Sequence, residues 1–247
     1  MQRKLKSKAK KFTKLIESGV WMKLLAISDV HGRSWAASEA ALLASKENFD
    51  AIILSGDLSP YMSLETAREI LEILVESGVP IFYVPGNMDD PKLTSNLNIK
   101  GTHNLHRKCI EFKEVKIIGV GGGLVGPFKT PLEYSEEEFS KMLNELSSKI
   151  SNEKFILVTH NPPFKTLADK LDWGEHVGSI SIRKFIEKQK PILNVCGHIH
   201  EARCIDRIGE TIIVNPGPAM RGYYAEIIIE EECQVLAKLM RMPKIEY

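Results

Sequence analysis

The sequence predicts a single-domain α/β protein, and three observations favour this class. Short apolar runs with the character of buried strands alternate along the chain with segments of helical periodicity. The first three runs each end in a turn rich in glycine and polar residues, namely DVHG, GDLS and PGNMDD. The chain has 247 residues, of which 43% are hydrophobic, so it can bury a substantial core. Elements in this order are typical of βαβ units, whose functional loops follow the carboxyl ends of the strands.

The predicted elements follow one another without a low-complexity linker or an internal repeat. Strands are expected at residues 23–28, 51–55, 81–84, 109–112, 115–120, 154–159 and 192–196. Helices are expected at residues 34–46, 63–77, 135–148 and 180–188. The third of these helices opens at Ser135 with Ser-Glu-Glu-Glu, and acidic residues suit a helix N-terminus. The last apolar runs, at residues 211–214, 223–229 and 235–240, are expected to be consecutive antiparallel strands.

Charge is distributed unevenly along the chain. Residues 1–21 carry a net charge of +6, so the remaining 226 residues sum to −5, although the whole chain has a net charge of +1. We expect residues 1–21 to be a basic N-terminal extension, a solvated tail rather than a contact for nucleic acid or a membrane surface. Residues 22–247 are expected to form one domain, and their acidic balance disfavours nucleic-acid binding. No apolar run approaches the ~18 residues that a membrane helix needs.

Cysteine usage indicates a reducing compartment. The four cysteines, Cys109, Cys196, Cys204 and Cys233, are few for this length and form no CxxC pair. They fit core or incidental thiols better than a disulfide framework or a zinc knuckle. The basic N-terminal segment also lacks the apolar stretch of a secretory signal, so we predict a cytoplasmic location.

Potential metal ligands follow the ends of the predicted core strands. They are Asp29, His31, Asp57, Asn87, His160, His198 and His200. Because functional loops cluster at the carboxyl ends of strands in open α/β sheets, these side chains are expected to converge. Carboxylate, imidazole and amide ligands together suit Mn²⁺, Fe²⁺ or Zn²⁺. Two divalent ions with only two carboxylates would leave a positive centre, which attracts phosphate oxygens.

The spacing of these residues supports one site. Asp29 and His31 are two residues apart, so both would point to the same side of an extended strand end, and His198 and His200 share this spacing. Glycines stand beside the ligands, where the backbone must turn or approach an ion closely: Gly32, Gly56, Gly86 and Gly197. Any one of these motifs occurs by chance, but the complete ordered set predicts a metal centre.

In these motifs the chain resembles the calcineurin-like metallophosphoesterases, and the stretch from NPPF to VNPGP is similar to their small prokaryotic, often archaeal, Icc-related branch. The resemblance runs from Met22 to the tail strands. It implies a four-layer α/β/β/α sandwich, with two mixed sheets flanked by helices, around two divalent metal ions. By this likeness Asp29, His31, Asp57 and His200 hold the first ion. Asp57, Asn87, His160 and His198 hold the second, with Asp57 bridging.

One position departs from the family pattern. The family usually has a histidine after Gly-Asn, which pairs with the following aspartate and helps to protonate the leaving group, but this chain has Met88. Methionine cannot transfer a proton, and a proton donor is typically worth ~10²–10⁴-fold in rate. Met88 is expected to pack against the wall of the site. We therefore predict slow turnover of monoesters with poor leaving groups and a preference for phosphodiesters.

The expected function is hydrolysis of a small phosphoester, nucleotides included, by attack of a metal-bridging hydroxide. Mn²⁺ is the preferred ion, with Fe²⁺, Zn²⁺ and Ni²⁺ as alternatives. Asp57 would set the metal spacing, and Asn87 would complete one ion's shell and contact the phosphate. Asp89 would orient a ligand or a neighbouring backbone group. His176, beside Trp173, is expected either to contact substrate at the mouth of the site or to belong to a packed surface lid.

Other signals are weaker. His103 and His106 lie in the segment THNLHRK, where solvated loop histidines are favoured over a substitute proton donor. Gly121–Gly123 lacks the Lys-Ser/Thr of a Walker loop. Two other functions stay open: a non-catalytic metal-binding module for protein interactions, as in a retromer subunit of this fold that lacks the same histidine, and a nuclease. The complete set of metal ligands favours the enzyme, and the net negative charge of residues 22–247 counts against the nuclease. Pairing of two chains through the tail strands stays open.

Overall fold

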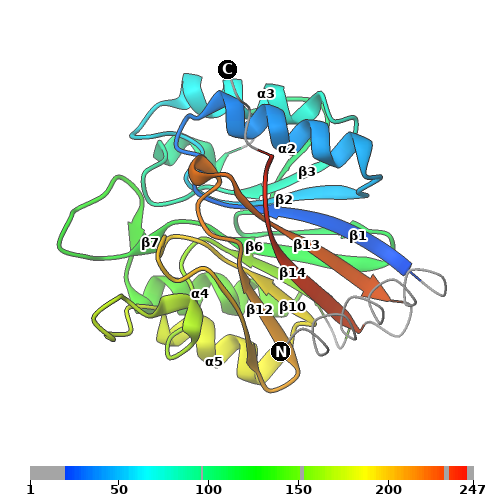
Figure 1. Ribbon diagram of the computed structural model, residues 1–247. Helices are drawn as coiled ribbons and strands as arrows, with labels where there is room; N and C mark the ends of the chain where they lie inside the picture. Colours follow the sequence, from blue (N-terminus) through cyan, green and yellow to red (C-terminus); the bar gives the residue numbers. More distant parts are fainter. Residues whose placement is uncertain (1–19, 96, 151–152, 231–233, 244–247) are drawn as a thin grey trace.

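Two six-stranded sheets face each other in the computed structural model, and each carries two helices on its outer side (Figure 1). The structure describes residues 20–243 except 96, 151–152 and 231–233. Helices α2 (Ser34–Lys46) and α3 (Leu64–Val75) cover the first sheet, and α4 (Glu136–Ser147) and α5 (Ile180–Gln189) cover the second. The predicted four-layer α/β/β/α sandwich is thereby confirmed, while most of the predicted basic extension lies outside the described residues.

The first sheet has the strand order β14-β13-β1-β2-β3-β4. Its strands are β1 (Val20–Ile27), β2 (Ala51–Ser55), β3 (Ile81–Val84), β4 (Thr102–Asn104), β13 (Tyr223–Glu230) and β14 (Val235–Arg241). The strands β1 to β4 are parallel, whereas β13 and β14 join antiparallel at the β1 edge. Strand β1 begins two residues before the boundary expected for the domain, so Val20 and Trp21 contribute to the sheet.

The second sheet has the order β11-β12-β10-β9-β6-β5. Its strands are β5 (Lys108–Phe112), β6 (Val115–Val120), β9 (Phe155–Thr159), β10 (Leu193–Val195), β11 (Cys204–Ile208) and β12 (Thr211–Asn215). The four central strands are parallel and the two edge strands pair antiparallel. Smaller elements are β7 (Gly123–Leu124), β8 (Glu133–Tyr134) and the 3₁₀ turns η1 (Pro91–Thr94), η2 (Leu167–Asp169) and η3 (Ala219–Arg221).

The apolar residues fill three layers, as the period-two alternation of strands requires. In β1, Leu25 and Ile27 pack toward the helices, while Leu24 and Ala26 face the second sheet. A third cluster lies between the second sheet and its helices. Two of the predicted helix N-termini have side-chain N-caps. Ser63 accepts a hydrogen bond from the Thr66 amide, and Ser135 forms a capping box with Glu138.

The tail strands match the prediction only in part. The antiparallel pairing of β13 with β14 is confirmed, but β12 lies in the second sheet, parallel to β10, and is not their neighbour. Every residue of β12 is buried, which fits a central strand between β10 and β11 better than a strand of a surface meander. Four short strands, β4, β7, β8 and β11, were not among the predicted elements.

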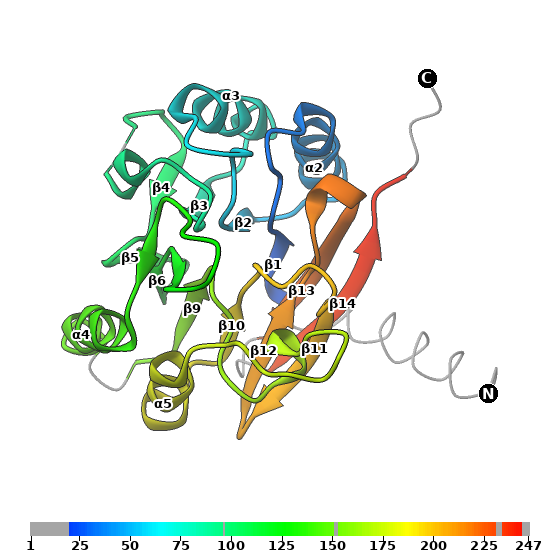
Figure 2. The same cartoon turned by 90° about the vertical axis from the view of Figure 1, so that its left-hand side faces the viewer.

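The carboxyl ends of the parallel strands of both sheets meet along one edge of the sandwich, the side turned toward the viewer in Figure 2. None of the described helices is long and apolar enough to cross a bilayer. The loops at this edge carry the candidate ligands.

Candidate metal centre

The candidate ligands come from loops of both sheets. Asp29 and His31 follow β1, Asp57 follows β2, and Asn87 follows β3; His160 follows β9, and His198 and His200 follow β10. Two groups of carboxylates and histidines have ligand atoms within 4.8 Å of one another. These groups are Asp29, His31 and His200, and Asp29, Asp57 and His160. The strand-end rule therefore brings together residues that are far apart in the sequence.

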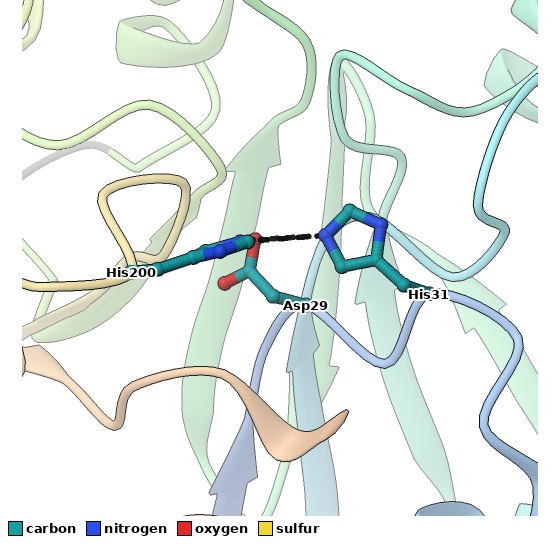
Figure 3. Close-up of side chains that lie close together, drawn as sticks. All are labelled: Asp29, His31 and His200. Carbon is teal, nitrogen blue, oxygen red and sulfur yellow. Dashed lines mark hydrogen bonds and ion pairs between the residues drawn. The ribbon is translucent and has the colours of Figure 1, made fainter. Parts of the chain in front are cut away.

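The first group is the more open of the two. His31 Nε2 lies 3.3 Å from His200 Nε2, and His200 Nε2 lies 3.2 Å from Asp29 Oδ1. Figure 3 shows the three side chains pointing toward one another from two separate loops. The side chains of His31 and His200 remain 14% and 26% exposed, whereas Asp29 is buried. A small ligand can thus reach this group from solvent.

The second group is buried and shares Asp29 with the first. His160 Nε2 lies 2.8 Å from Asn87 Oδ1 and 3.5 Å from Asp57 Oδ2. The same Asp57 oxygen lies 3.6 Å from His31 Nε2. One carboxylate oxygen therefore faces both sets of ligands, which is the position of a bridging ligand.

His198 occupies a different position from the other ligands. Its ring packs edge-on against the His160 ring, with centroids 5.0 Å apart, and its backbone amide donates to Asp29 Oδ2 at 3.2 Å. The His198 side chain is in neither of the two close groups. It stays a candidate ligand because it adjoins His160.

The donor atoms fit divalent cations. His160 Nδ1 lies 2.8 Å from the Ser55 carbonyl, and a carbonyl only accepts, so Nδ1 carries a hydrogen and Nε2 is the nitrogen that would bind an ion in place of its proton. Burial works to lower the pKa of His160, but the negative charges of Asp57 and Asp29 raise it to about 9. Burial works to raise the pKa of each carboxyl, yet the neighbouring histidines hold the pKa values of Asp29 and Asp57 below the usual range. A site that favours positive charge so strongly suits metal ions.

The ligand loops are turns and not extended strand ends, which corrects the expected geometry. Asp29, His31, Asp57 and His198 all have positive φ, between 46° and 70°. This left-handed conformation is uncommon for residues other than glycine, although asparagine, aspartate and histidine adopt it more often than the rest. Such residues are frequent at functional sites. The turn after β1 still brings Asp29 and His31 to one point, but it does so through backbone in the left-handed region. The glycines provide space: a Cβ at Gly86 would collide with the Asp57 carboxylate.

Asp89 ties two of these loops together. Its Oδ1 accepts hydrogen bonds from the Ser59 amide and hydroxyl at 2.8 and 2.9 Å, and its Oδ2 accepts from the amides of Gly86 and Leu58 at 2.8 and 3.1 Å. Burial raises the pKa of Asp89 to about 6, although these donors oppose the shift. All four contacts are to the loops after β2 and β3, so Asp89 orients backbone groups.

Met88 contributes its backbone to the centre. Its amide donates to Asp57 Oδ1 at 2.8 Å, and its carbonyl accepts from the Met62 amide at 2.9 Å. The side chain is half-buried. The residue at this position therefore helps to orient the Asp57 carboxylate without offering a titratable group.

Neither His103 nor His106 is a solvated loop histidine, which corrects that expectation. His103 lies in β4 and stacks on Phe82, with ring centroids 4.9 Å apart. His106 is buried, and its Nδ1 accepts the Gly121 amide hydrogen at 3.1 Å. Burial lowers the pKa of His106 to about 4, so the ring is neutral and supports the Gly121 turn.

The buried His106 should impose a pH dependence on stability. The unfolded chain binds a proton below pH 6.5, whereas the folded protein resists it down to about pH 4. The stabilising contribution is therefore complete above pH 6.5 and is lost as the pH falls toward 4, by about 3 kcal/mol in total. We expect H106N to flatten this part of the curve of unfolding free energy against pH, measured by urea denaturation. An unchanged slope in H106N would contradict the assignment, and H103N, whose ring is less buried, should change the slope less.

His176 belongs to a separate cluster. Its Nδ1 pairs with Asp169 Oδ1 at 2.7 Å, and its ring packs against Phe164. The buried Asp169 also accepts hydrogen bonds from the amides of Thr166 and Gly178, which closes the loop between β9 and α5. These contacts fit the interpretation of this loop as a packed surface lid. A contact between His176 and the substrate stays a prediction.

Two serines were not identified as site residues. Ser55 Oγ hydrogen-bonds the carbonyls of Ile27 and Cys196, which belong to different sheets, and Ser28 Oγ reaches the Ser55 carbonyl at 3.2 Å. Each serine immediately precedes a ligand motif, Ser28 before DVHG and Ser55 before GD. That adjacency was the available signal. The Ser55 hydroxyl connects the end of β1 with the residue that follows β10.

Comparison with known proteins identifies the family. The model of the metallophosphoesterases of the calcineurin superfamily matches residues 60–236. An uncharacterized protein of Methanocaldococcus jannaschii is 38% identical over 205 residues, which cover 80% of this chain and 89% of that protein. The chain belongs to the calcineurin-like metallophosphoesterase superfamily.

More distant relatives and solved structures agree with this assignment. A protein of Fibrobacter succinogenes named as a probable cyclic nucleotide phosphodiesterase is 23% identical over 184 residues, 72% of this chain and 68% of that protein. A crystal structure of a Thermus thermophilus protein has a TM-score of 0.71 at 20% identity, covering 90% of this chain and 99% of that one. A dimetal phosphatase from Danio rerio has a TM-score of 0.61 at 12% identity, covering 91% and 100%. At these identities the two structures establish the shared fold.

Proposed function

We propose that the protein is a dinuclear metal-dependent phosphodiesterase acting on small phosphoesters, including nucleotides. The observation that carries the proposal is the pair of ligand groups that share Asp29 and are bridged by the Asp57 carboxylate. Relatives named as probable cyclic nucleotide phosphodiesterases, at 23–26% identity, support a nucleotide as the substrate.

The residues present would hold one ion with Asp29, His31, Asp57 and His200, and a second with Asp57, Asn87, His160 and His198. Bound divalent ions supply charge that neutralises the phosphate and lowers the pKa of a water molecule to the neutral range. The open group containing His31 and His200 is the side from which substrate can enter. Asn87 positions its amide beside His160, where its NH₂ can donate to a phosphate oxygen.

The absence of a titratable side chain at Met88 supports the diester preference. A departing alkoxide needs a proton, and Met88 presents only backbone groups toward Asp57 and Met62. Esters with acidic leaving groups depend least on this help, and monoesters with poor leaving groups lose most without it. Manganese is the proposed ion because mixed carboxylate, imidazole and amide donors suit it, with Fe²⁺, Zn²⁺ and Ni²⁺ as alternatives.

A reconstitution assay tests the proposal. Protein stripped with a chelator and reloaded with Mn²⁺, Ni²⁺ or Zn²⁺ should hydrolyse bis-p-nitrophenyl phosphate with a higher kcat/KM than p-nitrophenyl phosphate, an ester with the same leaving group. Glycerol phosphate, which has a poor leaving group, should be the slowest substrate. The stripped protein should show only background hydrolysis.

The same assay separates the alternatives. Two ions bound per chain without turnover of any ester would favour the non-catalytic module. Salt-dependent DNA cleavage that disappears when residues 1–19 are deleted would favour the nuclease.

We further propose a cytoplasmic location, which the three described cysteines support because all of them are free thiols.

A further inference from the structure

The chain passes from the second sheet to the first at the edge that carries the candidate ligands. Strand β12 ends at Asn215 in the second sheet, and β13 begins at Tyr223 in the first. We call residues 215–222, which include the turn η3, the crossover. Its hydrogen bonds reach ligand loops of both sheets.

The first of these loops is the one that follows β1. The Ala219 amide donates to the Ser28 carbonyl at 2.7 Å, and the Met220 amide donates to the Asp29 carbonyl at 3.2 Å. Ser28 and Pro218 also form a parallel bridge. The crossover therefore holds the backbone of Asp29, which belongs to both close groups of candidate ligands.

The second loop is the one that follows β10, and Asn215 connects it with the crossover. Asn215 Nδ2 donates to the Ile199 carbonyl at 3.0 Å, and Oδ1 accepts the Gly217 amide hydrogen at 2.9 Å. Ile199 stands between His198 and His200, so the first bond acts on the segment that joins two candidate ligands. Asn215 is only 1% exposed, so water does not compete for these bonds.

The crossover thus links ligands that belong to different sheets. Asp29 Oδ1 lies 3.2 Å from His200 Nε2, although Asp29 follows β1 and His200 follows β10 (Figure 3). The side chains of a functional site must be held to within about 0.5 Å of the working geometry, and residues around metal ligands commonly do this. Asn215 is placed to hold one side of this pair while the backbone of the crossover holds the other.

Two further contacts of the loop after β10 explain its position less directly. The Ala202 amide donates to the same Ile199 carbonyl at 3.1 Å, but this bond lies within the loop and sets only its local shape. Arg203 Nε donates to the Pro216 carbonyl at 3.0 Å, at a point beyond His200 in the chain. The Asn215 bond is the one that joins the crossover to the segment between the two histidines.

We propose that Asn215 is a positioning residue that sets His198 and His200 against Asp29 in the metal centre. The inference rests on the metal centre of the proposed phosphodiesterase and adds a residue outside the ligand set on which the geometry of that centre depends. Asn215 acts through the Ile199 carbonyl and the crossover, not on the substrate.

Metal binding by N215S tests this role. Serine lacks the NH₂ donor to Ile199, whereas its hydroxyl can still accept the Gly217 amide hydrogen in a turn. Because loss of a residue that orients metal ligands typically lowers metal affinity about 10- to 100-fold, we expect the dissociation constant for Co²⁺ to rise by that factor in titrations of the metal-free protein. The visible absorption spectrum of the Co²⁺-saturated variant should also differ from that of the wild type, since it reports the geometry of the ligands.

N104S is the matched control. Asn104 is also 1% exposed, and its Oδ1 accepts the His106 amide hydrogen at 2.9 Å, as Asn215 Oδ1 accepts that of Gly217. Its Nδ2 donates to the carbonyls of Leu93 and Ser95, at 2.8 and 3.2 Å, and neither is a candidate ligand. N104S should lose stability in urea denaturation but keep the wild-type Co²⁺ affinity and spectrum.

An N215S protein with the affinity and spectrum of the wild type would overturn the proposal. An equal loss of affinity in N104S would do the same, because it would show a general effect of destabilisation. If N215S does not fold, N215T is judged by the same two measurements, since a β-branched side chain suits a strand end. Failure of both variants to fold would also overturn the proposal, because Asn215 would then serve the fold and not the centre.

The binding experiment also separates this proposal from the proposed activity. A wild-type protein that binds Co²⁺ in a manner dependent on Asn215, but hydrolyses no ester, would refute the phosphodiesterase and support the positioning role. Metal-dependent hydrolysis of the diester together with full Co²⁺ affinity in N215S would do the reverse. A wild-type protein that binds no Co²⁺ would refute both.

Discussion

Replacing Asp57 with asparagine is expected to abolish hydrolysis and to lower the number of metal ions bound per chain. Asp57 Oδ2 faces His31 Nε2 at 3.6 Å and His160 Nε2 at 3.5 Å, and the second oxygen is held by the Met88 amide at 2.8 Å. Asparagine keeps the size of the side chain but removes the charge that both ligand groups share. The expected loss in kcat/KM is about 10³-fold or more, because both ions depend on one carboxylate.

Metal analysis of the purified variant, together with the diester assay, checks this result. E65Q is the matched control, since it removes one negative charge from the exposed first turn of α3 and should change neither measurement. Near-ultraviolet circular dichroism establishes that D57N is folded. Full metal occupancy with full turnover in a folded D57N protein would refute the proposed centre.

Asp89→Asn is expected to produce the second largest effect, a loss of stability accompanied by a loss of activity. The carboxylate accepts four hydrogen bonds, whereas an amide must turn an NH₂ group toward at least one pair of donors. Buried hydrogen bonds to a charged acceptor contribute about 1.5–3 kcal/mol each, so we expect a loss of about 3 kcal/mol or more in unfolding free energy. Metal affinity should fall as well, because the loops carrying Asp57 and Asn87 lose their common anchor.

The pH dependence of kcat distinguishes positioning from proton transfer. If Asp89 only positions the loops, D89N lowers kcat at every pH and leaves the shape of the profile unchanged. D90N is the control, because the carboxylate of this next residue caps η1 by accepting the hydrogen of the Lys92 amide. A stable D89N protein that loses one limb of the pH profile would instead assign proton transfer to Asp89.

Sequence periodicity was sufficient to predict the layers of the fold but not to predict every strand in them. Helix α2 has the predicted bounds, and α3 starts at its predicted N-cap, because apolar spacing and caps are local signals. The strands β4 and β11 are short and only partly buried, so their composition does not separate them from loops. The placement of β12 depends on which sheet offers a partner, and a single sequence does not contain that information.

The proximity of the ligands was predictable because it follows from parallel strands, whereas their backbone conformation was not. A residue spacing of two suggests an extended strand, but Asp29 and His31 lie in left-handed turns. The burial of His106 could not be read from THNLHRK either, since its ring is covered through contacts with Gly121 and Tyr134, which lie later in the chain. Long-range packing decides such positions.

The ligand loops come from both halves of the chain, and this has a consequence for folding. Asp29 and His200 are 171 residues apart, and His31 and His200 are 169 apart. The segment from β1 to β3 supplies only Asp29, His31, Asp57 and Asn87, so it holds part of a centre until β9 and β10 have docked. Contacts at such separations form late, after the entropy of closing the long intervening loop has been overcome. We therefore expect metal uptake during refolding to follow the recovery of secondary structure.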